Sequence, residues 1–167
     1  MSSRMQQVEK WIRPLKPKVG AEIGVRHGQT IGYLLNQLED LCMYAVDPWE
    51  QQPDGNEKYD DWNFKDVYSR YKQSIGHNKK RVIELKMYST QAAELIPDNL
   101  LDFVFIDAQH DYESVKQDIS TWKHKVKKGG ILCGHDYDDR FDSVRKAVDE
   151  AFPNRMIGTN AVWGVWL

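Results

Sequence analysis

The tripeptide His-Asp-Tyr occurs twice in the chain, at 110–112 and at 135–137, and each copy follows an apolar run. Imidazole and carboxylate groups often act as acids, bases or metal ligands near neutral pH. An internal repeat, a His/Asp metal cluster, or two strand ends that meet at one active site would each produce this pattern. The residues that flank the two copies differ, which disfavours an internal repeat. Each copy lies just past the carboxyl end of a predicted strand, where ligands bind to open α/β sheets.

Two carboxylates are the last residues of these predicted strands, Asp107 in 100–107 and Asp136, itself part of the second copy, in 129–136. Neighbouring strands lie roughly 4.8 Å apart, so both side chains can converge on one point. Two carboxylates and water suit Mg²⁺ or another divalent cation, which would lower the pKa of a substrate hydroxyl. His135 is a candidate third ligand or a partner of the ligands. These residues predict a metal site at the edge of the sheet.

His110 is the candidate general base, because an imidazole titrates near neutral pH. The structural alternative is that His110 and His135 only hydrogen-bond the loops and that Asp111 caps the following helix. A zinc hydrolase is disfavoured, since the histidines lack tight ligand spacing and no cysteine lies at a strand tip.

The segment 22–28, EIGVRHG, ends the first predicted strand and opens a helix. A dinucleotide fingerprint needs G-x-G-x-x-G, but Arg26 stands where the middle glycine belongs, which disfavours a nicotinamide oxidoreductase. S-adenosylmethionine has no pyrophosphate and tolerates that change. Glu22 could meet the ammonium group of its amino-acid tail, while Gly24 and Gly28 let the backbone come close. A tight strand-to-helix turn would use the same glycines.

Asp47 ends the second predicted strand, 23 positions after Gly24, which is near the spacing of about 20 at which an acidic side chain accepts hydrogen bonds from a ribose. The alternative is that Asp47 only caps the next segment.

Length and composition bound the class of protein. With 167 residues, 41% of them hydrophobic, residues 1–167 are expected to form a single domain. Lys+Arg number 23 against 25 Asp+Glu, which disfavours nucleic acid as a partner. The chain has no apolar run of about 18 residues and starts with a polar segment, so we expect no membrane association and a cytoplasmic location.

Apolar runs of strand length alternate with helix-period segments, as in βαβ units. The predicted strands are 19–25, 41–47, 81–86, 100–107 and 129–136, and the predicted helices are 29–39, 89–95, 112–127 and 141–152. The end of the chain, RMIGTNAVWGVWL, predicts an antiparallel hairpin at the sheet edge. Residues 48–75 are too long for a plain crossover and predict a substrate-side insertion with helical periodicity from about Asn63.

The segments AEIGVRHGQT, YAVDPWE, LKMYSTQAA, LLDFVFIDAQHDYESVKQDISTW and KKGGILCGHDY, in this order, resemble the class I S-adenosylmethionine-dependent methyltransferases. The pairing of I-D-x-x-H-x-Y with G-H-D-Y is similar to the branch that includes sugar and natural-product O-methyltransferases. The resemblance covers roughly residues 19–167. It implies an α/β, Rossmann-like, doubly wound fold with a mostly parallel seven-stranded sheet whose last strand is reversed.

The resemblance also implies roles for individual residues. The expected cofactor-binding residues are Glu22, Gly24, Val25 and Gly28 at the methionine part, Asp47 at the ribose, Met87, Tyr88 and Ser89 at the adenine, and Asp107 near the sulfonium. The family usually has a small or acidic residue where this chain has Met87 and Tyr88, which leaves the adenine contacts open.

The function expected from these features is O-methylation of a hydroxyl on a sugar or another small metabolite. A non-catalytic cofactor-binding domain and an N-methyltransferase are the alternatives. The chain lacks the long cap with which larger members hold substrate, so either the 48–75 segment or a partner subunit in a homo-oligomer must take that role.

Overall fold

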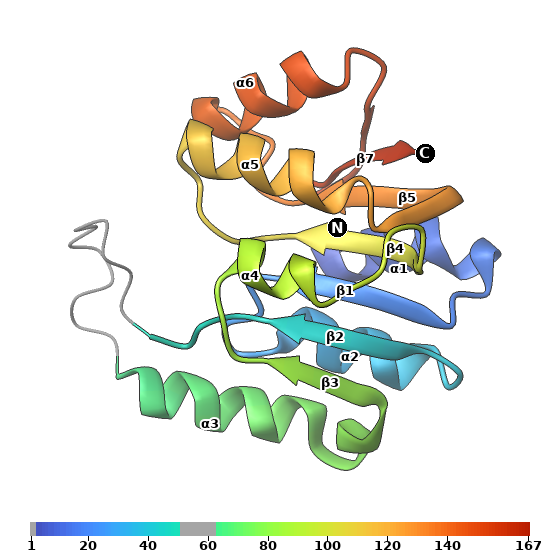
Figure 1. The fold of residues 1–167 in the computed structure, drawn as a ribbon, viewed down its shortest axis with the longest axis vertical. Coiled ribbons are helices and arrows are strands. Elements are labelled where there is room, and N and C mark those ends of the chain that lie inside the picture. Colours follow the sequence, from blue (N-terminus) through green and yellow to red (C-terminus); the bar gives the residue numbers. More distant parts are fainter. Residues whose placement is uncertain (1–2, 51–62) are drawn as a thin grey trace.

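A computed structural model describes residues 3–50 and 63–167 of the chain, which form a sheet covered by helices on both faces (Figure 1). The strands are β1 Val19–Ile23, β2 Cys42–Val46, β3 Val82–Leu85, β4 Leu101–Ile106, β5 Val126–Gly134, β6 Met156–Ile157 and β7 Trp163–Trp166. The α-helices are α1 Arg4–Ile12, α2 Gln29–Gln37, α3 Phe64–Ile75, α4 Ser89–Glu94, α5 Tyr112–Trp122 and α6 Asp142–Ala151. Two 3₁₀-helices follow α1 and α3, η1 Arg13–Leu15 and η3 Gly76–Arg81.

The seven strands lie in the order β3-β2-β1-β4-β5-β7-β6. The pairs from β3 to β5 are parallel, and β7 runs antiparallel to both of its neighbours. The predicted Rossmann-like, doubly wound and mostly parallel sheet is confirmed. From β1 the chain adds β2 and β3 on one side of the sheet, and it then returns to add β4 and β5 on the other side. Ligands bind at such a switch point, which here lies between the parallel strands β1 and β4.

Strand β4 shows why the apolar runs of the sequence are continuous. Every one of its residues is buried. Phe103 and Phe105 pack on one face with α1, α2 and α3, whereas Val104 and Ile106 pack on the other with α4, α5 and α6. Successive side chains of a strand point to opposite faces, so the part of β4 that is covered on both sides, Phe103 to Ile106, is apolar throughout.

The start of β5 was predicted wrongly. The helix expected over 112–127 ends at Trp122, and β5 begins at Val126 instead of 129. The cause is a bulge: Val126 pairs with Leu101, and the register then shifts before Ile131 pairs with Phe103. The polar residues between these pairs follow no strand-like alternation, which hid the early start.

Two other local predictions are confirmed. Asn63 caps α3, its side chain accepting a hydrogen bond from the Lys65 amide, as the periodicity from about Asn63 indicated. Strands β6 and β7 form the predicted hairpin, whose turn holds Asn160 and Ala161 at positive φ.

Residues 51–62 of the expected insertion lie outside the described part of the chain. Of the helices that the structure describes, none is long and apolar enough to cross a membrane.

Candidate active site

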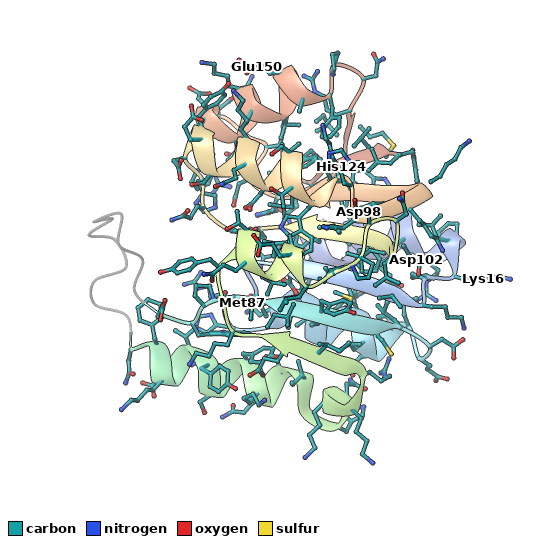
Figure 2. The ribbon with its side chains drawn as sticks, in the orientation of Figure 1. Lys16, Met87, Asp98, Asp102, His124 and Glu150 are labelled. Atoms are coloured by element: carbon teal, nitrogen blue, oxygen red, sulfur yellow. The ribbon has the colours of Figure 1, made fainter. Side chains whose placement is uncertain are left out.

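The carboxyl ends of the parallel strands open onto a cavity of about 700 Å³. Small-molecule and cofactor sites usually measure about 300 to 1,000 Å³. Figure 2 shows Met87 on this side of the sheet and Lys16 and Asp102 on the opposite side. Ten of the twelve predicted site residues line the cavity: Gly24, Val25, Asp47, Met87, Tyr88, Ser89, Asp107, His110, His135 and Asp136. Glu22 and Gly28 are not on its wall.

The turn after β1 depends on glycine. Gly24 has φ +84°, and a Cβ atom there would lie 2.3 Å from the backbone oxygen of Asp107 and 2.6 Å from Cα of Ala108. Only glycine lets this turn come so close to the end of β4. Gly28, at φ +71°, begins α2 behind the wall, where an added Cβ would meet the Tyr71 ring. Its role in this structure is therefore in backbone conformation and packing.

Glu22 lies beneath the cavity and not in it. Its side chain is buried, and one carboxylate oxygen, Oε2, has no hydrogen-bond partner among the described residues. Burial, and secondly the nearby charge of Asp107, raise the pKa of Glu22 well above its ordinary value, while the charge of Arg4 acts in the opposite direction. Burial thus favours the neutral form of this carboxyl group, which lies below the cavity and does not line it.

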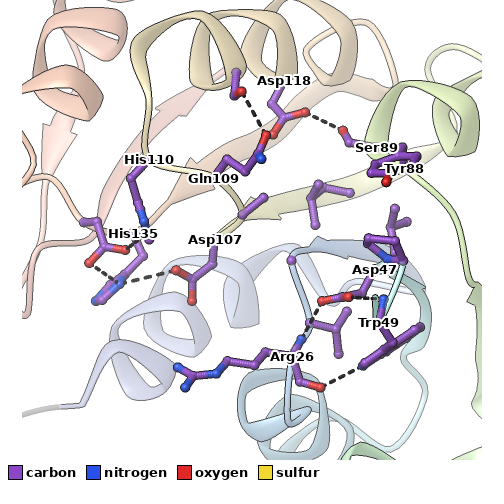
Figure 3. Close-up of a pocket in the computed structure, with 18 of the residues that line it drawn as sticks. Arg26, Asp47, Trp49, Tyr88, Ser89, Asp107, Gln109, His110, Asp118 and His135 are labelled. Carbon is purple, nitrogen blue, oxygen red and sulfur yellow. Dashed lines mark hydrogen bonds and ion pairs between the residues drawn. The ribbon is translucent and has the colours of Figure 1, made fainter. Parts of the chain in front are cut away.

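Asp47 clamps two loops together at the ribose end of the predicted site (Figure 3). Its Oδ2 accepts a hydrogen bond from the Arg26 amide at 2.8 Å, and its Oδ1 accepts one from the Trp49 amide at 2.7 Å. The indole Nε1 of Trp49 donates to the Arg26 carbonyl oxygen at 2.8 Å and closes the arrangement. Burial raises the pKa of Asp47, although these amides act against it. Each carboxylate oxygen can accept more than one hydrogen bond, so the clamp leaves capacity for ribose hydroxyls.

At the other end of this wall, Met87, Tyr88 and Ser89 line the cavity as predicted for adenine. The Ser89 hydroxyl donates to Asp118 Oδ1 and accepts from the Trp122 indole Nε1 at 2.8 Å. Asp118 also lines the cavity although only 6% of the residue is exposed. Burial raises the pKa of Asp118 to about 6, while the hydrogen bond from Ser89 acts to lower it.

The sequence interpretation missed Asp118, although a signal was present. Val115, Ile119 and Trp122 form the buried stripe of α5, and Asp118 lies on the same stripe. A carboxyl group within the apolar face of a helix is costly unless it has a partner, so such a position indicates a special environment.

The two His-Asp-Tyr copies meet in the part of the cavity that lies beyond the carboxyl ends of β4 and β5. Asp107, His110 and Asp136 each offer a possible ligand atom, and these atoms lie within 4.8 Å of one another. His110 Nε2 is 2.7 Å from Asp136 Oδ2. Opposite ligands of a small divalent ion lie about 4.2 Å apart, so a slight contraction would let the three groups hold one.

His135 was predicted as a third ligand or as a partner of the ligands, and the structure places it differently from His110. Its Nδ1 lies 3.0 Å from Asp136 Oδ1 and 3.5 Å from Asp107 Oδ1, without the alignment of a hydrogen bond. Burial alone would lower the pKa of His135, but the two carboxylates outweigh it and raise that pKa to about 9. Asp107 and Asp136 therefore favour the protonated form of His135, whereas a metal binds the neutral imidazole.

Local structure fixes His110 in place. Its ring stacks on Phe141, with 4.4 Å between the ring centroids, and its carbonyl oxygen accepts a hydrogen bond from the Ser143 hydroxyl. The next residue, Asp111, caps α5 by accepting from the Ser114 amide at 2.9 Å, which confirms that alternative for Asp111. His110 is thus held between the end of β4, a helix cap and α6.

Asp107 has an ion-pair partner that the sequence interpretation did not name. Arg4 Nη1 lies 3.1 Å from Asp107 Oδ2, and Arg4 lines the cavity.

Three other lining residues, Arg26, Trp49 and Asp136, have φ values between 46° and 60°, which is uncommon for residues other than glycine. Such conformations cluster at functional sites, where the surrounding structure holds them.

The fold is that of a class I methyltransferase. The sequence model of the family described as "Methyltransferase domain" matches residues 21–137, and the chain belongs to this family. The match begins in β1 and ends with Tyr137, the last residue of the second His-Asp-Tyr copy, so it includes the carboxyl ends of β1 to β5. The predicted resemblance to class I methyltransferases is confirmed.

Individual relatives are more distant. The chain is 24% identical over 137 residues to the uncharacterized protein y4gI of Sinorhizobium fredii, and this match covers 77% of the chain but only 14% of that protein. The O-methyltransferase NovP has a similar structure, with a TM-score of 0.67 at 20% identity, over 97% of this chain and 76% of that one. The O-methyltransferase TomG from Streptomyces achromogenes is involved in tomaymycin synthesis and was solved in complex with SAM. Its structure matches with a TM-score of 0.65 at 11% identity, over 95% of this chain and 77% of that one.

Proposed function

We propose that this protein transfers a methyl group from S-adenosylmethionine to a hydroxyl group of a small acceptor, such as a sugar or another hydroxylated metabolite. Membership of the methyltransferase family supports the reaction class. The observation that carries the proposal is the single cavity, which joins the Asp47 clamp at one end to the cluster of Asp107, His110 and Asp136 at another. A cofactor and an acceptor bound at these two places would face each other across the end of β4.

The residues present fit the cofactor. Asp47 retains acceptor capacity for a ribose, and Met87, Tyr88 and Ser89 offer an apolar and polar wall for an adenine. Gly24 brings the turn after β1 against the end of β4, where the methionine part would lie. The cavity is also large enough for a cofactor of this size together with part of an acceptor.

His110 and Asp136 can remove the acceptor proton. The bound cofactor would supply the methyl group and leave as S-adenosylhomocysteine when its sulfur–methyl bond breaks, and the acceptor oxygen must lose its proton as it forms the new bond to that carbon. His110 would accept this proton, and Asp136, whose Oδ2 lies 2.7 Å from Nε2, would stabilise the resulting imidazolium. Asp107, adjacent to both groups, would complete the negative side of the site.

We further propose that a divalent cation, Mg²⁺ or another, assists the reaction. Asp107, His110 and Asp136 would hold it, and it would lower the pKa of the acceptor hydroxyl. Mg²⁺ prefers oxygen ligands, whereas a set that includes an imidazole also suits transition metals such as Mn²⁺. A nitrogen that binds a metal cannot accept a proton, so the cation and the His110 base are separable alternatives.

Titration calorimetry with S-adenosylmethionine, S-adenosylhomocysteine and NAD tests the cofactor. We expect binding of the first two and not of NAD. The wild type is then incubated with S-adenosylmethionine and a panel of hydroxylated or amino acceptors, and products heavier by one CH₂ unit are sought by mass spectrometry.

A methylated hydroxyl product supports the proposal, and a product methylated only at nitrogen would replace it with N-methyl transfer. Cofactor binding without any product across the panel would favour a non-catalytic domain. The His110→Ala variant tests the proposed base. His124→Ala is its control, because His124 does not line the cavity.

A further inference from the structure

Arg4 is the first residue of α1, and its guanidinium reaches the cavity at the end of β4. It lies 3.1 Å from Asp107 Oδ2, and 30% of its side chain remains exposed. The charge of Arg4 also acts on Glu22 beneath the cavity floor. This cation therefore lies where the turn after β1 and the end of β4 come together.

The position of Arg4 is unfavourable for the helix itself. The amino terminus of a helix carries a partial positive charge, so an acidic residue is favoured there and a cation is not. The first turn of α1 holds no acidic residue. The helix start is stabilised by a capping box between Ser3 and Gln6 instead. The helix dipole thus does not favour Arg4, whose ion-pair partner is Asp107 in the cavity.

The rest of α1 holds Arg4 in a fixed place. Val8 and Ile12 are fully buried against the sheet. The side-chain oxygen of Gln7 accepts hydrogen bonds from the amide and the hydroxyl of Thr159, 3.1 Å and 3.0 Å away, which ties the helix to the terminal hairpin. An arginine presented by a rigid element loses little entropy when a ligand binds it.

The amino-acid tail of S-adenosylmethionine carries a carboxylate as well as positive charges. The carboxylates of Asp47 and Asp107 on the cavity wall suit the positive charges but repel a carboxylate. Arg140, another cation on the wall, is 73% exposed and already engaged by the carboxylate of Asp138. A planar guanidinium has several N–H donors and can contact Asp107 and a second carboxylate at once.

We propose that Arg4 determines cofactor specificity by binding the α-carboxylate of the methionine part of S-adenosylmethionine. The inference rests on the proposed function, since it assumes that this cofactor occupies the cavity. The ion pair with Asp107 holds the guanidinium ready in the free protein. Adenosine derivatives without the amino-acid tail do not benefit from Arg4, so the residue selects for the complete cofactor.

Two commercially available ligands separate this contribution from adenosine binding. S-adenosylhomocysteine carries the carboxylate and the ammonium group, and 5′-methylthioadenosine carries neither. Calorimetry measures both with the wild type, Arg4→Gln, Arg4→Lys and Arg13→Gln. Arg13 is a matched control, because it is an arginine just after the end of α1 that is paired with Glu9 and lies outside the cavity.

Arg4→Gln should weaken S-adenosylhomocysteine binding about 10- to 100-fold, as expected for a lost charge-assisted hydrogen bond, and change 5′-methylthioadenosine binding less than about twofold. Arg4→Lys should recover part of the loss, and Arg13→Gln should match the wild type. Undiminished S-adenosylhomocysteine binding by Arg4→Gln would overturn the inference, as would an equal loss for both ligands, which would indicate a structural role. A wild type that binds neither ligand would instead refute the proposed function.

Discussion

His110 Nε2 lies 2.7 Å from Asp136 Oδ2, although 26 positions separate the two residues in the chain. Each belongs to one of the two His-Asp-Tyr copies. They meet because β4 and β5 are adjacent and parallel, with Ile106 opposite Gly134, so both chains leave the sheet at the same level. The repeated tripeptide is therefore explained by convergence at one site and not by duplication of a structural unit.

This pair gives the first prediction. Excess chelator should abolish methyl transfer, and added Mg²⁺ or Mn²⁺ should restore it, because Asp107, His110 and Asp136 converge closely enough to share a cation. Asp136→Asn should lower turnover by about 100-fold or more while changing S-adenosylhomocysteine affinity little, since the cation acts on the acceptor. Assays of methyl transfer measure turnover, and calorimetry measures S-adenosylhomocysteine affinity. Titration of the free protein with Mn²⁺ measures binding of the cation directly.

Full activity in excess chelator would contradict the cation. His110→Ala then decides what replaces it: a loss of about 10²- to 10⁴-fold in turnover, with the chelator still without effect, would identify His110 as the general base. Asp139→Asn, a substitution at an exposed residue of the loop that follows β5, is the control for the charge change in Asp136→Asn.

The Asp47 clamp gives the second prediction. Asp47→Ala should weaken cofactor binding by roughly 1 to 3 kcal/mol through the lost ribose contact. It should also lower the free energy of unfolding by about 1 to 3 kcal/mol, because the amides of Arg26 and Trp49 lose their acceptor. Calorimetry and urea denaturation measure the two effects, with the exposed Glu39→Ala as the control. Unchanged affinity would remove Asp47 from the ribose site.

Arg81 gives the third prediction, which concerns stability. Its guanidinium donates to the carbonyl oxygens of Leu35, Leu38 and Leu41 and to the side chain of Asn78. It thus satisfies the carboxyl end of α2, where unpaired carbonyl groups and the helix dipole favour a cation. Arg81→Ala should lower the free energy of unfolding by about 2 to 4 kcal/mol in urea denaturation.

Arg81→Lys should recover only part of this stability, because an ammonium group cannot span the same set of acceptors. The neighbouring exposed Lys80→Ala provides the comparison for loss of one positive charge. Equal effects of Arg81→Ala and Lys80→Ala would show that the carbonyl contacts contribute nothing.

The sequence predicted the strands best where the physics is local. Phe103 to Ile106 alternate between two covered faces, so the run is apolar throughout and marks a central strand. Once β4 and β5 are neighbours, the meeting of Asp107 and Asp136 follows from the parallel direction alone. The end of α5 at Trp122 was missed because a bulge in β5 depends on pairing with a distant strand.

Arg4 and Asp118 show what sequence reasoning could not place. The partner of Arg4 is set by how α1 packs against the sheet, and more than 100 positions separate it from Asp107. Asp118 acquires its meaning from Ser89, which reaches it from another helix. Both residues break a local rule, a cation at a helix start and a carboxyl group on an apolar stripe. Such local conflicts are expected at functional sites and are the signal to seek there.

Asp118 gives the last prediction. Its pKa in the folded protein is about 6, above the ordinary 3.8, so the folded state binds this proton more tightly than the unfolded chain does. The stability that this group contributes is fully present below about pH 3.8 and is lost as the pH rises through about 6. Asp118→Asn removes the ionisation. The free energy of unfolding of this variant, relative to that of the wild type, should therefore rise by about 2 kcal/mol between about pH 4.5 and pH 7.5. Urea denaturation at several pH values measures this difference, and the exposed Asp139→Asn should show no such trend. Parallel stability curves for Asp118→Asn and the wild type would mean that Asp118 is not held in a protonated, desolvated state beside Ser89.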